Sequence, residues 1–178
     1  NDLKDGINFI FNLGKHKIKV IYDRADQNLP FRQEEPFKEI SERASKRATS
    51  MITDPQLFDL IQYVAQTQNV QGDVVEYGSL YGGSGAVIAE AVKYFGEKPV
   101  WLFDTFSGIP DSRYGLDFHW NGSFADNSYA AVKDAFLDMK NVQVIKGNIM
   151  KTYKKVTNPI SFGYLASDTL ESGEILIN

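Results

Sequence analysis

The amino-acid sequence predicts an α/β domain with one doubly wound parallel sheet. Two observations predict this fold class. Short apolar runs, bounded by glycine, proline and polar residues, alternate with amphipathic helical patterns from about residue 53 onward. A glycine-rich turn follows the first of these runs, and an aspartate ends the second. Strands that alternate with helices pair in parallel through right-handed crossovers, so we expect helices on both faces of the sheet.

Four apolar runs are expected to form the strands. They are DVVEY, PVWLFD, VQVIKG and ISFGYLAS, at residues 73–77, 99–104, 142–147 and 160–167. The final stretch, ESGEILIN, has the pattern of the start of another helix. Because doubly wound nucleotide-binding sheets commonly have five or more strands, we expect the C-terminal part of the domain to be incomplete in this sequence.

Helices are expected before and between these strands. The first is predicted to begin with Asp54 as its N-cap and Pro55 at its first helical position. The second, SGAVIAEAVKYF at residues 84–95, is expected to stop at Gly96. The third is predicted to be capped by Asp126. It carries an apolar face formed by Tyr129, Val132, Phe136 and Met139.

Length and composition are those of one ordinary globular domain. The 178 residues divide into a charged N-terminal arm, 1–46, with no assigned role, and the sheet domain, 47–178. The net charge of −4 argues against a nucleic-acid partner, and no apolar run approaches the roughly 20 residues that cross a bilayer. The absence of cysteine excludes disulfides and thiolate catalysis, and it agrees with a reducing cytoplasm.

The glycine-rich turn GSLYGGSG, residues 78–85, predicts a ligand site. In an open parallel sheet, ligands bind beyond the carboxyl ends of the strands. Glycines let a ligand approach the backbone, and the following helix offers free N–H groups. Tight packing of strand against helix is the alternative use of such glycines. The spacing matches neither the dinucleotide pattern G-x-G-x-x-G nor a phosphate-binding P-loop.

Two carboxylates narrow the choice of ligand. Asp104 ends the second strand, where an acidic residue typically accepts hydrogen bonds from ribose hydroxyls. An aspartate that only stabilises a turn is the alternative. Glu76 lies inside the first strand, and a buried carboxylate there needs donors such as an ammonium group or backbone N–H groups. Together they indicate an adenosine ligand with an amino-acid tail.

Four segments resemble the macrocin O-methyltransferase family. They are GDVVEYGSLYGGSG, VWLFDTFSGIPD, FADNSYAAVKDAF and VQVIKGNIMKTY, and the resemblance extends from about Thr49 to Ser172. Members of this family are class I, S-adenosylmethionine-dependent enzymes that methylate sugar hydroxyls of small molecules. The resemblance therefore implies the Rossmann-like sheet of class I methyltransferases, with the residues 1–46 as an extension.

The resemblance also implies which residues hold S-adenosylmethionine. Those around its methionine and ribose part would be Glu76, Gly78, Gly82, Gly83 and Ser84. Asp104 would hold the ribose diol. The adenosine side would be lined by Thr105, Phe106 and Ser107, and the adenine would face Gly147 and Asn148.

The resemblance implies two catalytic residues. His119, in LDFHWNGSF, lies where family members place a substrate-facing histidine, and imidazole is suited to act as a base near neutral pH. Relatives also carry an Asp-x-Asp motif that binds Mg²⁺, and here Asp168 matches its second aspartate while Ala166 replaces the first. The loss of one ligand carboxylate puts Mg²⁺ in question. Apart from the resemblance, the aromatic residues Tyr114, Phe118 and Trp120 of this loop would either line an acceptor pocket or cover the core.

Three functions stay open at this point. The leading one is an O-methyltransferase with a small, sugar-containing acceptor. A nicotinamide-dependent oxidoreductase shares the strand, loop and terminal acid but needs a different glycine spacing. A non-catalytic domain that binds S-adenosylmethionine is favoured by Ala166. No nucleic-acid or membrane partner is expected, and the charged N-terminal arm is a possible contact in a homo-oligomer.

Overall fold

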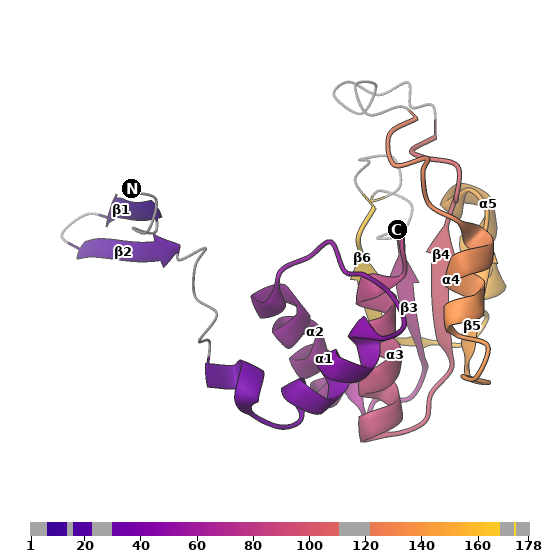
Figure 1. Cartoon of the computed structure of the whole chain (residues 1–178), viewed down its shortest axis with the longest axis horizontal. Coiled ribbons are helices and arrows are strands. Elements are labelled where there is room, and N and C mark those ends of the chain that lie inside the picture. The colour runs from indigo at the N-terminus through magenta and orange to yellow at the C-terminus, as the bar shows by residue number, and fades with distance from the viewer. Residues whose placement is uncertain (1–6, 14–15, 23–29, 111–121, 168–172, 174–178) are drawn as a thin grey trace.

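The computed structural model describes residues 7–13, 16–22, 30–110, 122–167 and 173. Its centre is a four-stranded sheet in the order β5-β4-β3-β6 (Figure 1). All three neighbouring pairs are parallel. The strands are β3 (Asp73–Tyr77), β4 (Val100–Asp104), β5 (Val142–Lys146) and β6 (Ile160–Leu165). The four strands predicted from the sequence are confirmed, each within two residues of its expected ends.

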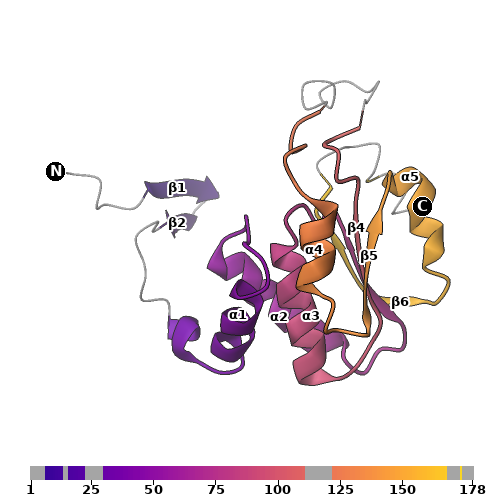
Figure 2. The ribbon, with the colours of Figure 1, turned by 45° about the vertical axis from the view of Figure 1, so that its right-hand side comes forward.

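Helices cover both faces of this sheet, as a doubly wound fold requires (Figure 2). One face carries α1 (Phe37–Ser45), α2 (Asp54–Thr67), α3 (Gly83–Phe95) and α4 (Tyr129–Ala135). The other face carries α5 (Ile149–Thr152) and the 3₁₀ turn η3 (Tyr153–Lys155). The chain returns from β5 past β4 and β3 to reach β6, so the direction of winding reverses between β3 and β6.

The side chains of β3 point alternately to the two faces of the sheet, so they contribute to two apolar clusters. Val74 belongs to the larger apolar cluster, beneath α1 to α4, and Val75 and Tyr77 belong to the smaller cluster with Ile149 of α5. Successive side chains of a strand point to opposite faces, so every residue of this central strand is buried. Glu76 shares the face of Val74 and therefore points toward α3.

Two predicted helix caps are wrong by one or two residues. Thr53, not Asp54, is the N-cap of α2, and its backbone N–H donates to the Gln56 side chain at 2.9 Å. Ser128, not Asp126, caps α4, because its side chain accepts from the N–H of Ala131. In each case two adjacent or nearby polar residues are both good caps, and the local backbone decides between them.

The C-terminal ends of the helices agree better with the ends predicted from the sequence. Gly96 follows the last residue of α3 and donates its N–H to Val92. Helix α4 ends at Ala135, so Met139, which was expected on its apolar face, lies beyond the helix but is still buried. The helix expected over 171–178 falls outside the described residues, apart from Gly173.

The N-terminal part contains more structure than the sequence indicated. Strands β1 (Ile7–Leu13) and β2 (His16–Tyr22) form an antiparallel hairpin, and η1 (Pro30–Gln33) precedes α1. Helix α1 packs on α3 and buries three apolar side chains in the larger core cluster, namely Phe37, Ile40 and Ala44. A search of the described residues for a membrane-spanning helix, at least 18 residues long and strongly apolar, finds none.

Polar side chains at the amino end of the sheet are held by one another. The buried Asp73 carboxylate accepts hydrogen bonds from Trp101 Nε1 at 2.8 Å and from Asn158 Nδ2 at 3.2 Å. The Lys98 ammonium group donates three hydrogen bonds, which connect the end of α2 to the start of β6. Their acceptors are Thr67 O, Val70 O and Ser161 Oγ, at 2.8, 2.6 and 3.0 Å.

Candidate functional site

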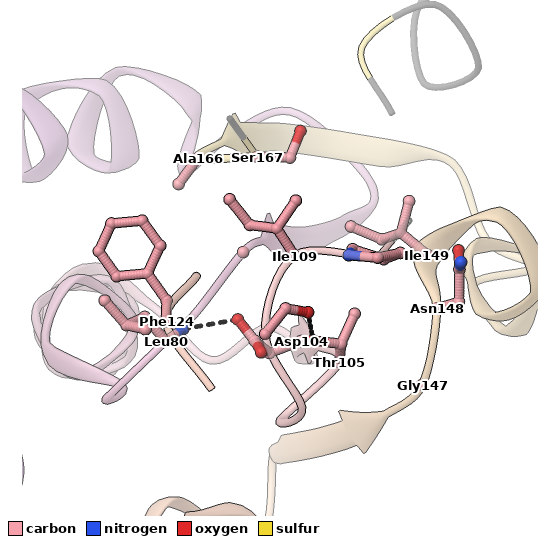
Figure 3. A pocket seen from close by; sticks show the side chains of 13 residues that line it. Leu80, Asp104, Thr105, Ile109, Phe124, Gly147, Asn148, Ile149, Ala166 and Ser167 are labelled. Carbon is pink, nitrogen blue, oxygen red and sulfur yellow. Dashed lines mark hydrogen bonds between the residues drawn. The ribbon is translucent and has the colours of Figure 1, made fainter. Parts of the chain in front are cut away.

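A cavity lies at the opposite edge, where all four strands of the sheet end (Figure 3). The short segment after each strand lines the cavity, and Phe124, from the loop before α4, completes the wall. This is the place where open parallel sheets bind ligands, next to the point at which the winding reverses. Its lining residues are Gly78, Leu80, Asp104, Thr105, Gly108, Ile109, Pro110, Phe124, Gly147, Asn148, Ile149, Ala166 and Ser167.

The loop after β3 needs two of its glycines for backbone reasons. Gly78 has φ +98° and lies so close to the next strand that an added Cβ would be 2.6 Å from Ala166 O. Gly82 has φ +84°, immediately before the first residue of α3. Both conformations favour glycine, and the close approach at Gly78 brings the loops after β3 and β6 together beside the cavity.

Two further glycines of the same motif serve packing inside the protein. An added Cβ at Gly83 would lie 2.3 Å from Thr49 O, so the segment before α2 crosses directly over the start of α3. At Gly85 an added Cβ would lie 2.7 Å from Glu76 Oε2. The sequence left open whether the glycines bind a ligand or allow tight packing, and these two allow tight packing.

Glu76 is completely buried beneath this loop. Its Oε1 accepts a hydrogen bond from the Ser84 hydroxyl. Burial raises the pKa of Glu76 to about 7, while the bond from Ser84 opposes that shift. The side chain points toward α3 and is not part of the cavity wall, so its carboxyl group supports the loop from below.

Asp104 lines the cavity and organises the loops on both sides of it. Its Oδ2 accepts from the Leu80 N–H at 2.8 Å, which is drawn in Figure 3. Its Oδ1 accepts from the Phe106 N–H at 2.7 Å and from Asn127 Nδ2 at 3.2 Å. An aspartate that accepts from the N–H two residues later forms an Asx turn, so the turn-stabilising use of Asp104 is present, and ribose binding stays a prediction.

The other walls come from the turns after β4 and β5. The Thr105 hydroxyl donates to Gly108 O at 2.6 Å and so closes the turn that carries Ile109. Gly147 has φ +145°, and its N–H donates to Asp104 O at 2.9 Å. Asn148 caps α5 by accepting from the Met150 N–H at 2.8 Å. These hydrogen bonds fix the walls in place.

The structure brings together five of the residues predicted to hold a cofactor. Gly78, Asp104, Thr105, Gly147 and Asn148 line the cavity. The predicted residues outside its wall are Glu76, Gly82, Gly83, Ser84, Phe106 and Ser107. The Phe106 side chain is turned inward, where it is 6% exposed and packs on the ring of Tyr129.

Sequence reasoning missed the apolar part of the wall. Leu80, Ile109, Phe124 and Ile149 face the cavity, and none of them was predicted to do so. A signal was available for Ile149, because it stands directly after Gly147 and Asn148, which follow the end of β5, and for Ile109, which lies in the turn after β4. Leu80 and Phe124 offered none, since their positions depend on a left-handed backbone, with φ +47° and +61°.

Buried polar atoms without a protein partner gather at this edge. Within the described part of the chain, two of them are Asn127 Oδ1 and Ser167 Oγ, and the buried Ser79 hydroxyl has only the Glu76 carboxyl group as a partner. Buried polar groups are nearly always paired, so such a cluster is typical of a site that a ligand or water completes. An apolar wall with a carboxylate acceptor fits a nucleoside, which has one flat apolar part and one hydroxylated part.

The predicted catalytic and metal residues lie outside the described residues. These are His119 and Asp168, together with Tyr114, Phe118 and Trp120 of the predicted acceptor pocket. Ala166, which the resemblance predicts to stand where relatives carry a ligand carboxylate, does line the cavity. Among the described ranges, no three histidine or acidic side chains converge to hold a metal ion.

Comparison with known families gives this geometry a context. The family model of macrocin-O-methyltransferase (TylF) matches residues 11–159. The chain belongs to this family. The resemblance inferred from the sequence is therefore confirmed, and the match includes the glycine-rich loop, Asp104 and the turn after β5.

Solved structures support the fold of this macrocin-O-methyltransferase family member. The structure of the O-methyltransferase NovP is similar with a TM-score of 0.59 and 24% identity, over 69% of this chain and 57% of that one. CalS11, a calicheamicin methyltransferase, gives a TM-score of 0.60 and 19% identity, over 79% and 70% of the two chains. The chain thus spans little more than half the length of NovP. No curated protein sequence matches it.

Proposed function

We propose that this chain is an S-adenosylmethionine-dependent O-methyltransferase that acts on a hydroxyl of a small, sugar-containing acceptor. The observation that carries the proposal is Asp104, which faces the cavity at the end of β4 in a member of the macrocin-O-methyltransferase family. The names of NovP and CalS11, two methyltransferases with the same fold, support the reaction class.

The cavity offers a partner for each part of the nucleoside. Asp104 would accept a hydrogen bond from a ribose hydroxyl, and the apolar side chains of Ile109, Phe124 and Ile149 would pack against the adenine. Gly78 leaves room for a ligand against bare backbone. When bound, S-adenosylmethionine supplies an electrophilic methyl group. The protein's main contribution to such a displacement is to align the donor and the acceptor.

The acceptor hydroxyl has a high pKa and needs a base or a metal ion to become nucleophilic. On the sequence evidence we assign the base to His119 and a supporting or metal-binding carboxylate to Asp168. His119→Ala should lower kcat by at least about a hundredfold, the usual size of general-base catalysis, and leave the Kd for S-adenosylmethionine unchanged. A fully active His119→Ala enzyme would remove this assignment.

The first experiment is a calorimetric titration with S-adenosylmethionine, with NAD as the control ligand. Each is titrated with and without Mg²⁺, and methyl transfer to sugar hydroxyls is then assayed under both conditions. Micromolar binding of S-adenosylmethionine alone supports the proposal. Binding of NAD, or no binding of either ligand to folded protein, would overturn it. Activity that requires Mg²⁺ would support a metal-binding role for Asp168.

A second candidate function is a non-catalytic domain that binds S-adenosylmethionine. Ala166 favours it, because an apolar side chain occupies the cavity wall where relatives carry a ligand carboxylate. Binding without methyl transfer to any hydroxyl acceptor would support this alternative, and Ala166→Asp would then test whether the missing carboxylate is the cause.

Two further parts of the proposal come from the sequence alone. We propose a homo-oligomer in which the N-terminal arm takes part, and a cytoplasmic location. Light scattering of the full chain and of a variant without residues 1–29 tests the first, and cell fractionation tests the second. A monomer in both light-scattering measurements would contradict the first.

A further inference from the structure

Asn127 lies behind the cavity, between the loops that follow β3 and β4. It is 8% exposed and is not part of the cavity wall. Its Nδ2 donates to Leu80 O at 3.3 Å and to Asp104 Oδ1 at 3.2 Å. Both partners are acceptors, so the amide nitrogen must be the atom that faces them. The side chain thus joins the two loops that carry the wall.

These two loops contain unusual backbone conformations. The described residues other than glycine with positive φ are Leu80 at +47°, Phe106 at +50° and Phe124 at +61°. All three belong to the loops around the cavity, and such conformations persist only where surrounding contacts enforce them. The enforcing contacts at the first two are visible, and they come from Asp104 and Asn127.

Leu80 is held at both of its backbone polar groups. Its N–H donates to Asp104 Oδ2 at 2.8 Å, and its C=O accepts from Asn127. The N–H of Phe106 donates to the other oxygen of Asp104 at 2.7 Å. Because Asn127 also donates to that carboxylate, the Asp104–Asn127 pair holds both left-handed residues at once.

The same contacts determine how many lone-pair positions of the Asp104 carboxylate remain free to accept a hydrogen bond from a ligand. A carboxylate has about four lone-pair positions. Within the described ranges, Oδ1 accepts two hydrogen bonds and Oδ2 accepts one. One position on Oδ2 is therefore free. A carboxylate held by three donors cannot turn to offer a different oxygen without breaking one of those bonds.

We propose that Asn127 is a positioning residue of this site. It fixes the Asp104 carboxylate and the left-handed Leu80, so that one lone pair of Asp104 and the wall formed by Leu80 are in place before the nucleoside arrives. The inference rests on the proposed function for the identity of the ligand. Preorganisation of this kind raises affinity because the ordering cost is met during folding.

The test replaces Asn127 with two residues of nearly the same size. Asn127→Leu removes the donor but fills the space, and Asn127→Asp replaces the donor with a second acceptor. The matched control is Asn158→Leu, because Asn158 Nδ2 also donates to a carboxylate, that of Asp73, at the far end of the sheet. Calorimetry gives the Kd for S-adenosylmethionine, and thermal unfolding confirms that each variant is folded.

Hydrogen exchange supplies a measurement that needs no cofactor. In Asn127→Leu the amides of Leu80 and Phe106 should exchange at least about tenfold faster than in the wild type, because their acceptor is no longer fixed. In Asn158→Leu both rates should be unchanged. The Kd should rise about tenfold in Asn127→Leu, the effect of one lost hydrogen bond to a charged group, and remain within twofold in the control.

The pH profile separates positioning from packing. The introduced carboxyl in Asn127→Asp would face Asp104, with Glu76 on the adjacent strand and Asp126 next along the chain. Two close carboxylates raise the pKa of one of them, so acidification restores a donor. The affinity of Asn127→Asp, relative to the wild type at each pH, should therefore be lowest at pH 8 and recover by pH 5.5. A packing role predicts no such recovery.

The outcomes distinguish this inference from the proposed function. Faster exchange at Leu80 with a raised Kd supports both. If the wild type binds no S-adenosylmethionine, the proposed function fails, and the exchange rates still decide whether Asn127 holds the loops. Unchanged exchange and unchanged Kd in a folded Asn127→Leu would overturn the inference.

Discussion

The two ends of the sheet differ in how completely their buried polar groups are hydrogen-bonded to the protein. At the amino end, Asp73 and Lys98 are paired with protein donors and acceptors, and the Lys98 ammonium uses all three of its N–H groups. At the carboxyl end, Asn127 Oδ1 and Ser167 Oγ are buried without a protein partner among the described residues, and the left-handed Leu80 and Phe124 line the cavity. Both ends belong to the same four strands.

This difference indicates that the amino end of the sheet stabilises the fold and that the carboxyl end binds the ligand. Paired polar groups tie strands and helices together, so the amino end holds the fold. Unpaired groups and strained backbone lower stability and persist where a function requires them. We therefore expect substitutions at the amino end to lower the free energy of unfolding, and substitutions at the carboxyl end to lower affinity for the ligand.

The largest effect is expected from Glu76→Gln and depends on pH. The pKa of Glu76 is raised from 4.5 to about 7, so the folded protein binds this proton more tightly than the unfolded chain. The resulting stability is fully present below pH 4.5 and is lost as the pH rises to 7. The difference in free energy of unfolding between variant and wild type should move by about 3 kcal/mol in favour of Gln from pH 5 to pH 8. Urea unfolding at both pH values measures it, and a constant difference would contradict the raised pKa.

Asp73→Ala should have the next largest effect and act on stability alone. It leaves Trp101 Nε1 and Asn158 Nδ2 without their acceptor, and the free energy of unfolding should fall by about 2–3 kcal/mol. Urea unfolding checks the fall, and calorimetry of the folded variant should give an unchanged Kd for S-adenosylmethionine. A weakened Kd would show that the two ends of the sheet are not independent.

Asp104→Ala should weaken binding and also lower the free energy of unfolding by about 1–3 kcal/mol, because the N–H groups of Leu80 and Phe106 lose their acceptor. It removes the acceptor proposed for the ribose, and the binding free energy should weaken by about 1–3 kcal/mol, the scale of hydrogen bonds to a charged group. Calorimetry with S-adenosylmethionine measures this change, and Asp138→Ala, on the surface beside Arg47, is the control. If the Kd is the same in Asp104→Ala and the wild type, Asp104 does not take part in the site.

The smallest effect is expected from Phe124→Gly. Glycine removes the left-handed strain, but it gives the unfolded chain more freedom and removes a ring that is only 42% exposed, so the free energy of unfolding should change by less than about 1 kcal/mol. Affinity should fall about threefold, since apolar wall area is lost. Leu137→Gly, at an exposed residue outside the positive-φ set, has no such strain to relieve. Thermal unfolding measures both changes, and a loss of several kcal/mol at Phe124 would show that the packing of its ring outweighs its strain.

The sequence was informative wherever a property depends on near neighbours along the chain. Continuous apolar runs located all four strands, and the positions of Gly78 and Asp104 at strand ends placed both at the cavity. The caps of α2 and α4 were misplaced because Thr53 and Ser128 compete with nearby aspartates, and small differences in backbone direction decide.

The remainder depends on contacts between distant segments. The direction of Glu76 follows from how α3 lies on β3, and the place of Leu80 depends on Asn127, 47 residues later. Neither relation has a local pattern. The hairpin β1–β2 was also missed, because residues 1–46 were given no secondary structure.

Helix α1 has a practical meaning for anyone who wishes to shorten this protein. A chain cut at the predicted boundary, to begin at residue 47, would lose Phe37, Ile40 and Ala44 and leave apolar surface of α3 in water. Exposed surface of that kind drives self-association. A cut ahead of Pro30 removes the hairpin and keeps this cover, so the useful limit for engineering lies about 17 residues earlier than composition alone indicated.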